Sequence, residues 1–435
     1  MTKGNQKKPA VGSTPQHVSS SHLLTGEKVS FADDATKPKA SDEELNSRYA
    51  KGEIRIVTEQ ARYPLAGILG MLKEEVESDG GKKEPRYKLD PEYQRRHRWS
   101  AERKSRLIES FLMNVPVPPV FLYERDLARF EVMDGRQRLT ALSDFYANKF
   151  ELTGLQYWSD LEGRKYSQLP SKVRDGIDRR YISSIILLKE TAASEEQAAM
   201  LKKMVFERLN SGGVKLGSQE TRNAVYSGPL NKLCLDLSES EMFRRMWGIP
   251  LEPAPEEKNA DEESEETVDE PTVAGTRMFE KMEDVELVLR FFAYRQIDEF
   301  KAGLNKISEF LDLFIVRGNN FSASLLANYR TMFESTVSFL WNALEGDAFT
   351  VIGHSKRPTK IVYDPLMYVA NSGGVVPHRA KLLAKKDILR SELEAMYKAN
   401  HALFSGRRTN FKDTQDRNRC VAEAFAAALA KTKKS

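Results

Sequence analysis

The sequence predicts an α+β protein, with a mixed N-terminal domain followed by a mostly α-helical domain. Short runs rich in β-branched and aromatic residues are typical of strands, and three of them, Val120–Tyr123, Phe130–Met133 and Tyr181–Leu188, fall in the first half. Helical patterns alternate with these runs. After residue 275 the strand signals almost vanish, and apolar residues recur with the 3.6-residue period of helices.

Two segments of biased composition set the expected domain limits. Residues 1–45 are rich in Ser, Thr, Lys, Pro and Gly, which predicts a disordered tail. Residues 251–275 are strongly acidic and predict a disordered loop. The expected order is therefore a tail, an α/β domain over 46–250, the acidic loop, and a helical domain over 276–435.

The first elements are expected between the tail and the middle of the α/β domain. Ile54–Val57 favours a short strand, and Pro64–Glu77 favours a helix. Ser100 is a suitable cap for the next helix, which carries an apolar stripe. The proline-rich turn Val115–Pro119 should end that helix, because proline cannot continue it.

The strands Val120–Tyr123 and Phe130–Met133 follow, and a helix from Gly135 to about Ala147 comes directly after them. Ser194 and Gln197 form a capping-box pattern that opens another helix. Beyond it, helical patterns are predicted at Ser218–Tyr226, Met278–Ile297, Lys306–Arg317, Ser322–Leu344, Ala380–Ala399 and Asp416–Ala430.

The overall charge hides an uneven distribution. The net charge is +4, but Glu252–Glu270 holds ten acidic residues and one lysine, about −9, which leaves the rest near +13 (4 + 9). A basic surface of that size attracts polyanions such as DNA. No apolar run approaches the roughly 20 residues of a membrane helix. With only Cys234 and Cys420 and no secretory signal, a cytoplasmic location is expected.

Known catalytic patterns are scarce. The six histidines lack metal-ligand spacing, and complete P-loop and G-x-S-x-G motifs are both missing. The most informative segment is Phe130–Thr140, where a strand ends at Asp134, Gly135 makes a turn and a helix begins. Free N–H groups at a helix start favour an anion, and Arg136 and Arg138 suit phosphate. A purely structural helix start fits the same residues, so both interpretations stay open.

Two further clusters carry polar and aromatic groups. Pro91–Trp99 holds four basic residues, a glutamine and two aromatics, which suit phosphates and stacked bases. Phe206–Gly213 ends in an Asn-Ser-Gly-Gly turn that could place backbone N–H groups on an anion, and Gln219–Asn223 continues it. The alternatives are a basic loop with its aromatics in the core and an ordinary helix C-cap.

Together these clusters resemble the N-terminal domain of GmrSD-type restriction endonucleases, which act on modified DNA. The family's D-G-Q-Q-R hallmark stands here as Asp134–Arg138, with Arg136 where glutamine is usual, and it follows Gln94–Arg95 and Trp99 in the family's order. The family's later asparagine–glycine motif is matched by Phe206, Leu209, Asn210, Gly212 or Gly213 and Leu216, followed by Glu220 and Arg222.

The resemblance implies a ParB/sulfiredoxin-like fold, a nucleoside triphosphate (NTP) bound with Mg²⁺, and a role in bacterial anti-phage defence. It implies that Asp134, Gln137 and Arg138 are catalytic, with Asp134 also the metal ligand. The nucleotide-binding residues it implies are Gln94, Arg95, Gly135, Arg136, Arg138, Asn210 and Glu220. The expected DNA-binding residues are Arg96, Arg98, Arg407 and Arg408.

The expected partners are DNA and, because an HNH nuclease pattern is not recognised around His354, His378 and His401, a separate nuclease. A homo-oligomer is compatible with the sequence. Two other functions stay open. One is a non-catalytic DNA-binding or adaptor protein, favoured by Arg136. The other is a metal-dependent DNA nickase with Asp134 and either Glu131 or Glu220 as metal ligands, although Glu131 on the same strand as Asp134 should point to the opposite face.

Overall fold

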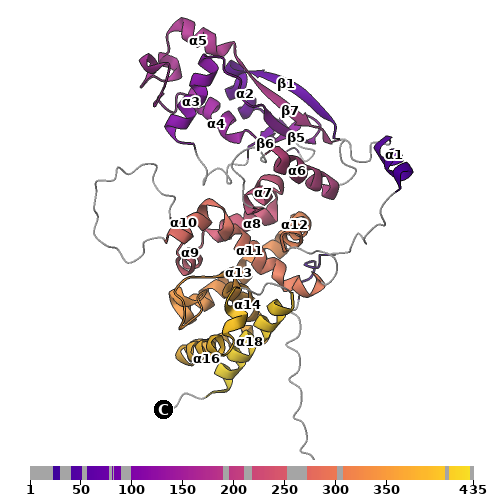
Figure 1. Cartoon of the computed structure of the whole chain (residues 1–435), viewed down its shortest axis with the longest axis vertical. Coiled ribbons are helices and arrows are strands. Elements are labelled where there is room, and N and C mark those ends of the chain that lie inside the picture. The colour runs from indigo at the N-terminus through magenta and orange to yellow at the C-terminus, as the bar shows by residue number, and fades with distance from the viewer. Residues whose placement is uncertain are drawn as a thin grey trace, which may run out of the picture. The chain divides into compact units, whose positions relative to one another are not determined.

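The computed structural model shows an α+β architecture with one mixed sheet and many helices (Figure 1). The described residues are 23–29, 41–50, 56–77, 81, 83–89, 99–189, 195–209, 218–251, 272–300, 307–406 and 411–431. The acidic segment Glu252–Glu270 lies outside them. No helix in the described ranges is long and apolar enough to cross a membrane.

Contacts along the chain define two compact units, and each is described by itself. The sheet-containing unit comprises Val29–Leu289 and Ala302–Leu326. The all-helical unit comprises Met1–Lys28, Arg290–Lys301 and Ala327–Ser435.

The main sheet has five strands in the order β1-β7-β5-β6-β4. Two pairs, β7 with β5 and β6 with β4, are parallel, and the other two are antiparallel. These strands are β1 (Thr58–Pro64), β4 (Tyr87–Lys88), β5 (Val120–Asp126), β6 (Arg129–Asp134) and β7 (Tyr181–Leu187). A small second sheet pairs β2 (Glu75–Glu77) with β3 (Lys83–Pro85).

Opposite faces of the main sheet meet different helices. On one face, strand residues such as Leu122, Val132 and Ile186 join one core with residues of α2 (Ile68–Lys73), α3 (Ala101–Leu112), α4 (Arg136–Tyr146) and α5 (Ser171–Asp178). Glu131 alternates with Val132 and contacts α6 (Glu195–Leu209), so α6 lies on the other face.

The remaining helices of this unit follow α6 along the chain. They are α7 (Ser218–Val225), α8 (Pro229–Ser238), α9 (Glu241–Trp247), α10 (Val273–Glu280), the first part of α11 (Glu283–Ala293), α12 (Ile307–Gly318) and the start of α13 (Ala323–Leu344). The short helix α1 (Asp42–Ala50) precedes the sheet.

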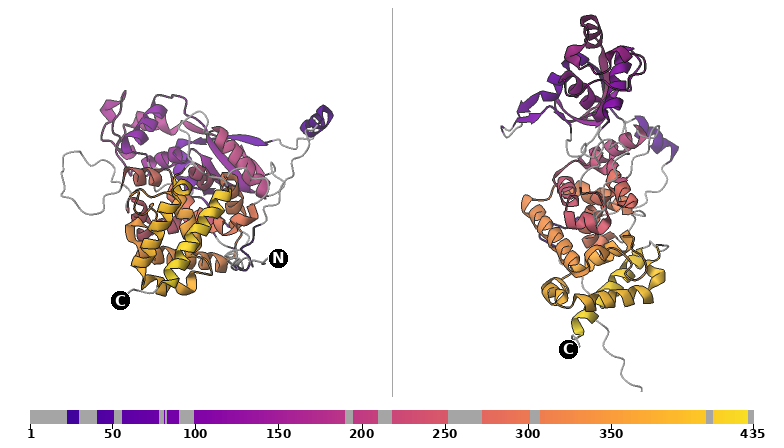
Figure 2. Two further views of the ribbon diagram at one scale, coloured as in Figure 1. Left: turned by 60° about the horizontal axis from the view of Figure 1, so that its bottom comes forward. Right: turned by 90° about the vertical axis from the view of Figure 1, so that its left-hand side faces the viewer.

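The all-helical unit contains α14 (Lys360–Ala370), α15 (Arg379–Leu383), α16 (Lys386–Ala399), α17 (His401–Phe404) and α18 (Phe411–Ala430). Helices α16 and α18 run side by side (Figure 2). Buried Glu27 pairs with Arg295, in the 3-10 segment Tyr294–Phe300, at 2.6 Å. Other 3-10 turns are Leu65–Gly67, Ser159–Leu161, Tyr166–Gln168, Glu345–Asp347 and Val376–His378.

Most predicted elements of the α/β domain are confirmed. Ser100 does cap α3, because its hydroxyl accepts from the Arg103 amide, and α3 ends at Leu112 before the proline-rich turn. The helix predicted over Pro64–Glu77 is only partly correct. Glu75–Glu77 forms β2 instead, because it pairs with β3, a contact that local periodicity does not encode.

The first strand and the N-terminal segment also differ from the sequence-based expectation. The strand predicted at Ile54–Val57 lies partly outside the described residues, and β1 begins only at Thr58. Leu23–Val29 falls in the segment expected to be a tail, yet Glu27 is fully buried. Its ion-pair partner Arg295 is 268 positions away, so composition gave no sign of this contact.

Candidate functional site at the turn between β6 and α4

Gly135 connects β6 to α4 in a left-handed backbone conformation. Its φ is 91°, and a Cβ built there would lie 2.5 Å from Cγ1 of Val120. Only glycine meets both conditions without strain. The Leu139 amide donates to the Gly135 carbonyl at 2.9 Å, so the hydrogen bonds of α4 begin at this turn. The sequence predicted this turn and helix start, and the structure has both.

Asp134 and Arg138 form an ion pair across the first turn. Nη2 of Arg138 donates to Oδ2 of Asp134 at 2.9 Å and to the Pro119 carbonyl at 3.2 Å. The Nε of Arg138 is buried and has no hydrogen-bond partner among the described residues. Asp134 keeps 36% of its side-chain surface exposed. A partly exposed carboxylate and a guanidinium with an unused donor therefore meet at a helix N-terminus.

Arg136 belongs to a different set of contacts. It is buried, and its Nε donates to the Val132 carbonyl at 2.7 Å. Residues two apart on a helix project roughly 200° from each other, so Arg136 and Arg138 leave α4 in different directions. The structure therefore pairs Arg138 with Asp134 and directs the Nε of Arg136 to the Val132 carbonyl, and binding of an anion by both guanidiniums stays a prediction.

Glu131 lies with Arg136 on the α6 side of the sheet. It accepts from Lys202 at 2.7 Å, and the same ammonium lies 4.6 Å from the ring centroid of Tyr123. Burial opposes ionisation of Glu131, but Lys202, with Arg136 and Lys88 nearby, outweighs it and holds the pKa of this carboxyl below its usual range.

The expected separation of Glu131 from Asp134 is confirmed, because one side chain pairs with α6 and the other with α4. This geometry disfavours a pair of carboxylates on one metal ion. Within the described ranges, no group of three or more His, Cys, Asp or Glu could hold a metal ion.

Helix α7 carries the part of the third sequence cluster that the structure describes. Glu220 is buried there, and so is Arg222. Arg222 pairs with Glu286 on α11 at 2.9 Å and with Asp312 on α12 at 2.8 Å, and also donates to Ser308 and Gln219. Sequence reasoning missed this structural role, since the acidic partners are 64 and 90 positions away.

Several expected site residues cannot be placed. Gln94, Arg95, Arg96, Arg98, Asn210, Arg407 and Arg408 lie outside the described residues. The structure therefore brings together Asp134, Gly135 and Arg138, places the half-buried Gln137 in the same turn, and locates Glu220 on α7. Closure of the site by the other residues remains a prediction.

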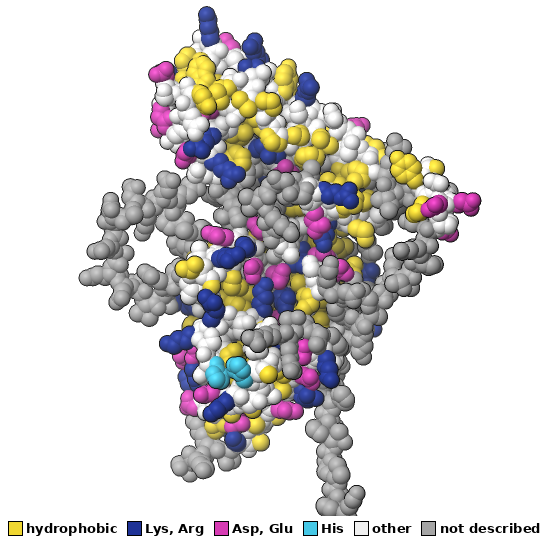
Figure 3. Space-filling view, viewed as in Figure 1, with side chains coloured by type: hydrophobic (Ala, Val, Ile, Leu, Met, Phe, Trp, Pro, Cys, Tyr) yellow, Lys and Arg dark blue, Asp and Glu magenta, His cyan; other side chains and the backbone are white. Residues whose placement is uncertain are grey.

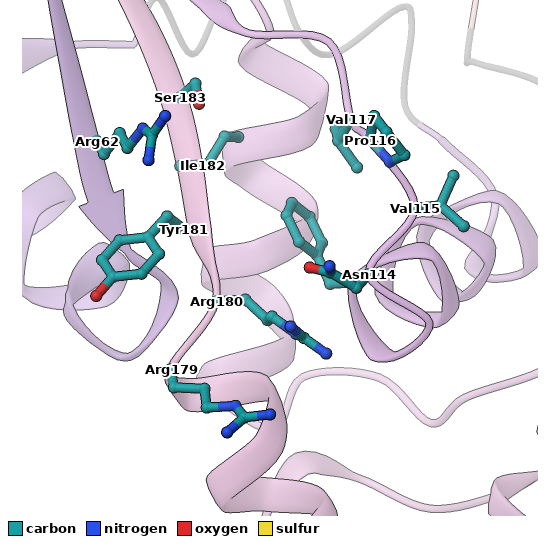
Figure 4. Close-up of a pocket in the computed structure, with 11 residues that line it drawn as sticks. Arg62, Asn114, Val115, Pro116, Val117, Arg179, Arg180, Tyr181, Ile182 and Ser183 are labelled. Atoms are coloured by element: carbon teal, nitrogen blue, oxygen red, sulfur yellow. The ribbon is translucent and has the colours of Figure 1, made fainter.

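Sequence reasoning also missed a basic cavity of about 450 Å³. Its walls come from Arg62 on β1, Arg179 and Arg180 after α5, the start of β7 and the loop Asn114–Val117 (Figure 4). No motif marks these arginines, because they come from elements more than 100 positions apart in the chain and meet only through β1–β7 pairing.

A comparison with known families finds a similarity within the sheet-containing unit. Residues 78–227 match the family model of the GmrSD restriction endonuclease, N-terminal domain. The matched segment includes the turn at Gly135, β5–β7 and α3–α7. No curated protein and no solved structure gives a significant match to the chain.

Proposed function

We propose that this chain is a nucleotide-dependent DNA-recognition component of a bacterial restriction-type defence system. Its GmrSD-type domain, with a ParB/sulfiredoxin-like fold, binds and hydrolyses an NTP at Asp134–Arg138. One observation carries the proposal: a left-handed glycine turn starts α4 beside a carboxylate–guanidinium pair, inside the segment that matches the family. Such a helix start is a natural phosphate site.

Each group in the turn has a distinct role in this proposal. The first-turn amides and Arg138 bind phosphate oxygens, because charge-assisted donors match them well. Asp134 suits Mg²⁺, which is commonly held by one or two carboxylates together with substrate phosphates. Gln137 orients the attacking water. Gln94 and Arg95 close over the nucleotide, and Asn210 and Glu220 complete the wall.

The Asp134–Arg138 ion pair provides the direct test. The double variant Asp134→Ala with Arg138→Ala is expected to lose NTP turnover, measured as phosphate release with each of the four NTPs and Mg²⁺. The matched control removes Glu102 and Arg106, another pair spaced i,i+4, on α3, and should keep turnover. Normal turnover in the Asp134–Arg138 variant would contradict the assignment.

DNA is the proposed partner, and a separate nuclease is proposed to cut it. Nucleotide hydrolysis would gate DNA action by changing how the α/β part packs on its helices. The role of DNA follows the family name of the matched segment.

A non-catalytic DNA-binding or adaptor role is the second candidate. It is favoured by Arg136, which is directed toward the Val132 carbonyl rather than toward Asp134. Isothermal titration of the full chain with the four NTPs distinguishes the candidates. Saturable heat with one NTP supports the nucleotide site, whereas an absence of heat supports the adaptor.

A further inference from the structure

Three arginines gather in the cavity described above, which the proposed nucleotide site does not use. On the face of the molecule in Figure 3, basic side chains are dispersed among acidic and hydrophobic ones. In the cavity, by contrast, Arg62, Arg179 and Arg180 line one space, and none of the described residues that line it is acidic. Figure 4 shows Arg180 extending toward the loop that carries Asn114, with Arg179 next to it at the end of α5.

These three guanidiniums are not neutralised by neighbours. Within the described part of the chain, none of them has an ion pair or a side-chain hydrogen bond, and the Nε of Arg180 is buried without a partner. Other arginines of this unit are paired, as Arg86 is with Glu74 and Arg125 with Glu84. Three unneutralised positive charges around one cavity favour an anion with several oxygens, such as a phosphate.

The size and the other walls of the cavity indicate more than a bare phosphate. Its volume of about 450 Å³ is in the range of sites that take whole small molecules. Val117 lines the cavity as a partly exposed apolar residue, and Tyr181 is 56% exposed. Aromatic and apolar surfaces beside a basic groove suit the sugar and base of one nucleotide unit.

The sheet topology places this cavity near the turn at Gly135 but separate from it. β7 runs parallel to β5 and β6 runs antiparallel, so the starts of β5 and β7 share an edge with the end of β6, where Asp134 stands. The loop before β5 lies between them. Val117 lines the cavity, whereas the Pro119 carbonyl accepts from Arg138.

We propose that the Arg62–Arg179–Arg180 cavity binds a phosphodiester of DNA, with the attached nucleotide against the exposed side chain of Tyr181. The inference deepens the proposed function, because it assumes that DNA is the partner and names where the strand is held. The cavity is open to a polymer and takes its charge from three arginines. We therefore expect it to bind the DNA backbone whatever the base sequence.

The test measures DNA binding by the full chain. Fluorescence anisotropy with labelled single-stranded and duplex oligonucleotides gives the affinities. The variant combines Arg62→Gln with Arg179→Gln, both exposed residues, so the fold should be retained. The control combines Arg164→Gln with Lys172→Gln, two exposed basic residues of the same unit that do not line the cavity. Both variants lose two positive charges.

The cavity variant should bind DNA roughly tenfold more weakly at about 0.1 M salt. Its slope of log Kobs against log salt should be about one unit shallower on duplex DNA, because the contact with one phosphate is lost. The control should change both quantities little. Equal weakening in the two variants, or a wild-type chain that does not bind DNA, would overturn the inference.

A parallel titration with NTPs separates this inference from the proposed function. The cavity variant should bind and hydrolyse NTP as the wild type does. If it loses NTP binding while DNA binding persists, the cavity is a nucleotide subsite and the inference is overturned. If the wild-type chain binds DNA through the cavity but hydrolyses no NTP, the inference stands and the nucleotide proposal fails.

Discussion

At the scale of single residues, local backbone geometry fixes the position of the candidate site. Gly135 is held at φ 91° with Val120 against its α-carbon, so the chain can leave β6 and start α4 only through glycine. The sequence showed this, because D-G between a strand and a helix has a local signature. It could not show that Arg136 and Arg138 separate, since that depends on which helix faces meet the sheet and the loop.

Gly135→Ala should destabilise the chain by about 2–4 kcal/mol, because left-handed backbone and overlap with Val120 each cost about 1–2 kcal/mol. Gly163→Ala is the control. Gly163 has φ 74° but open space around its α-carbon, so only the backbone cost of about 1–2 kcal/mol applies. Urea unfolding measures the free energy of unfolding of both variants. Equal losses would show that the Val120 contact is unimportant.

The lowered pKa of Glu131 gives a pH-dependent contribution to stability. A carboxyl whose folded-state pKa is depressed stabilises the fold above its unfolded pKa and loses that contribution as pH falls through the folded value. Glu131→Gln should therefore destabilise the chain at pH 7, and the difference from wild type should narrow below about pH 4.3. Urea unfolding at pH 7, 5, 4 and 3 tests this, and a difference independent of pH would contradict it.

At the scale of elements, the chain was most predictable where the pattern is local. α3, α4, β5, β6 and β7 follow from apolar periodicity, caps and turn residues. The short helices α8, α9 and α14 were not predicted, and β2 was mistaken for helix, because pairing and burial rather than propensity decide these segments. α14 even contains Pro365, a residue that normally argues against a helix interior.

Arg222 shows how distant elements are held together, since its guanidinium joins α7 to α11 and α12. Arg222→Met should cost about 3–5 kcal/mol, because it removes a buried partner from Glu286 and from Asp312, of which Asp312 keeps its ion pair with Lys203. Lys232→Ala removes a largely exposed i,i+4 pair on α8 and should cost less than about 1 kcal/mol. Similar unfolding midpoints for the two variants would rule out this role of Arg222.

At the scale of the whole molecule, contacts between distant segments define the units. The pair between Glu27 and Arg295 spans 268 positions and fastens residues near the N-terminus to the all-helical unit. The composition of residues 1–45 predicted a tail because it lacks large apolar residues. Within Leu23–Val29 the buried Glu27 carboxylate pairs with Arg295 and the Glu27 carbonyl accepts from Gln296, and no compositional measure detects such contacts.

Coupling between Glu27 and Arg295 should appear in a double-mutant cycle. Glu27→Gln or Arg295→Met alone should each cost about 3–5 kcal/mol, because each leaves a buried charge unpaired. The double variant should cost less than the sum of the two by more than about 1 kcal/mol. Thermal unfolding of the four proteins gives the coupling energy, and strict additivity would show that the two side chains act independently.

The salt bridge across the first turn of α4 has a consequence for the order in which ligands arrive. Asp134 accepts from Nη2 of Arg138, so in the proposed site a phosphate that binds the same nitrogen displaces the Asp134 carboxylate. The displaced carboxylate then lies beside the negatively charged phosphate, and the two groups repel each other. A divalent cation between them would relieve this repulsion. Nucleotide and Mg²⁺ would therefore enter as one complex, and neither would bind tightly alone.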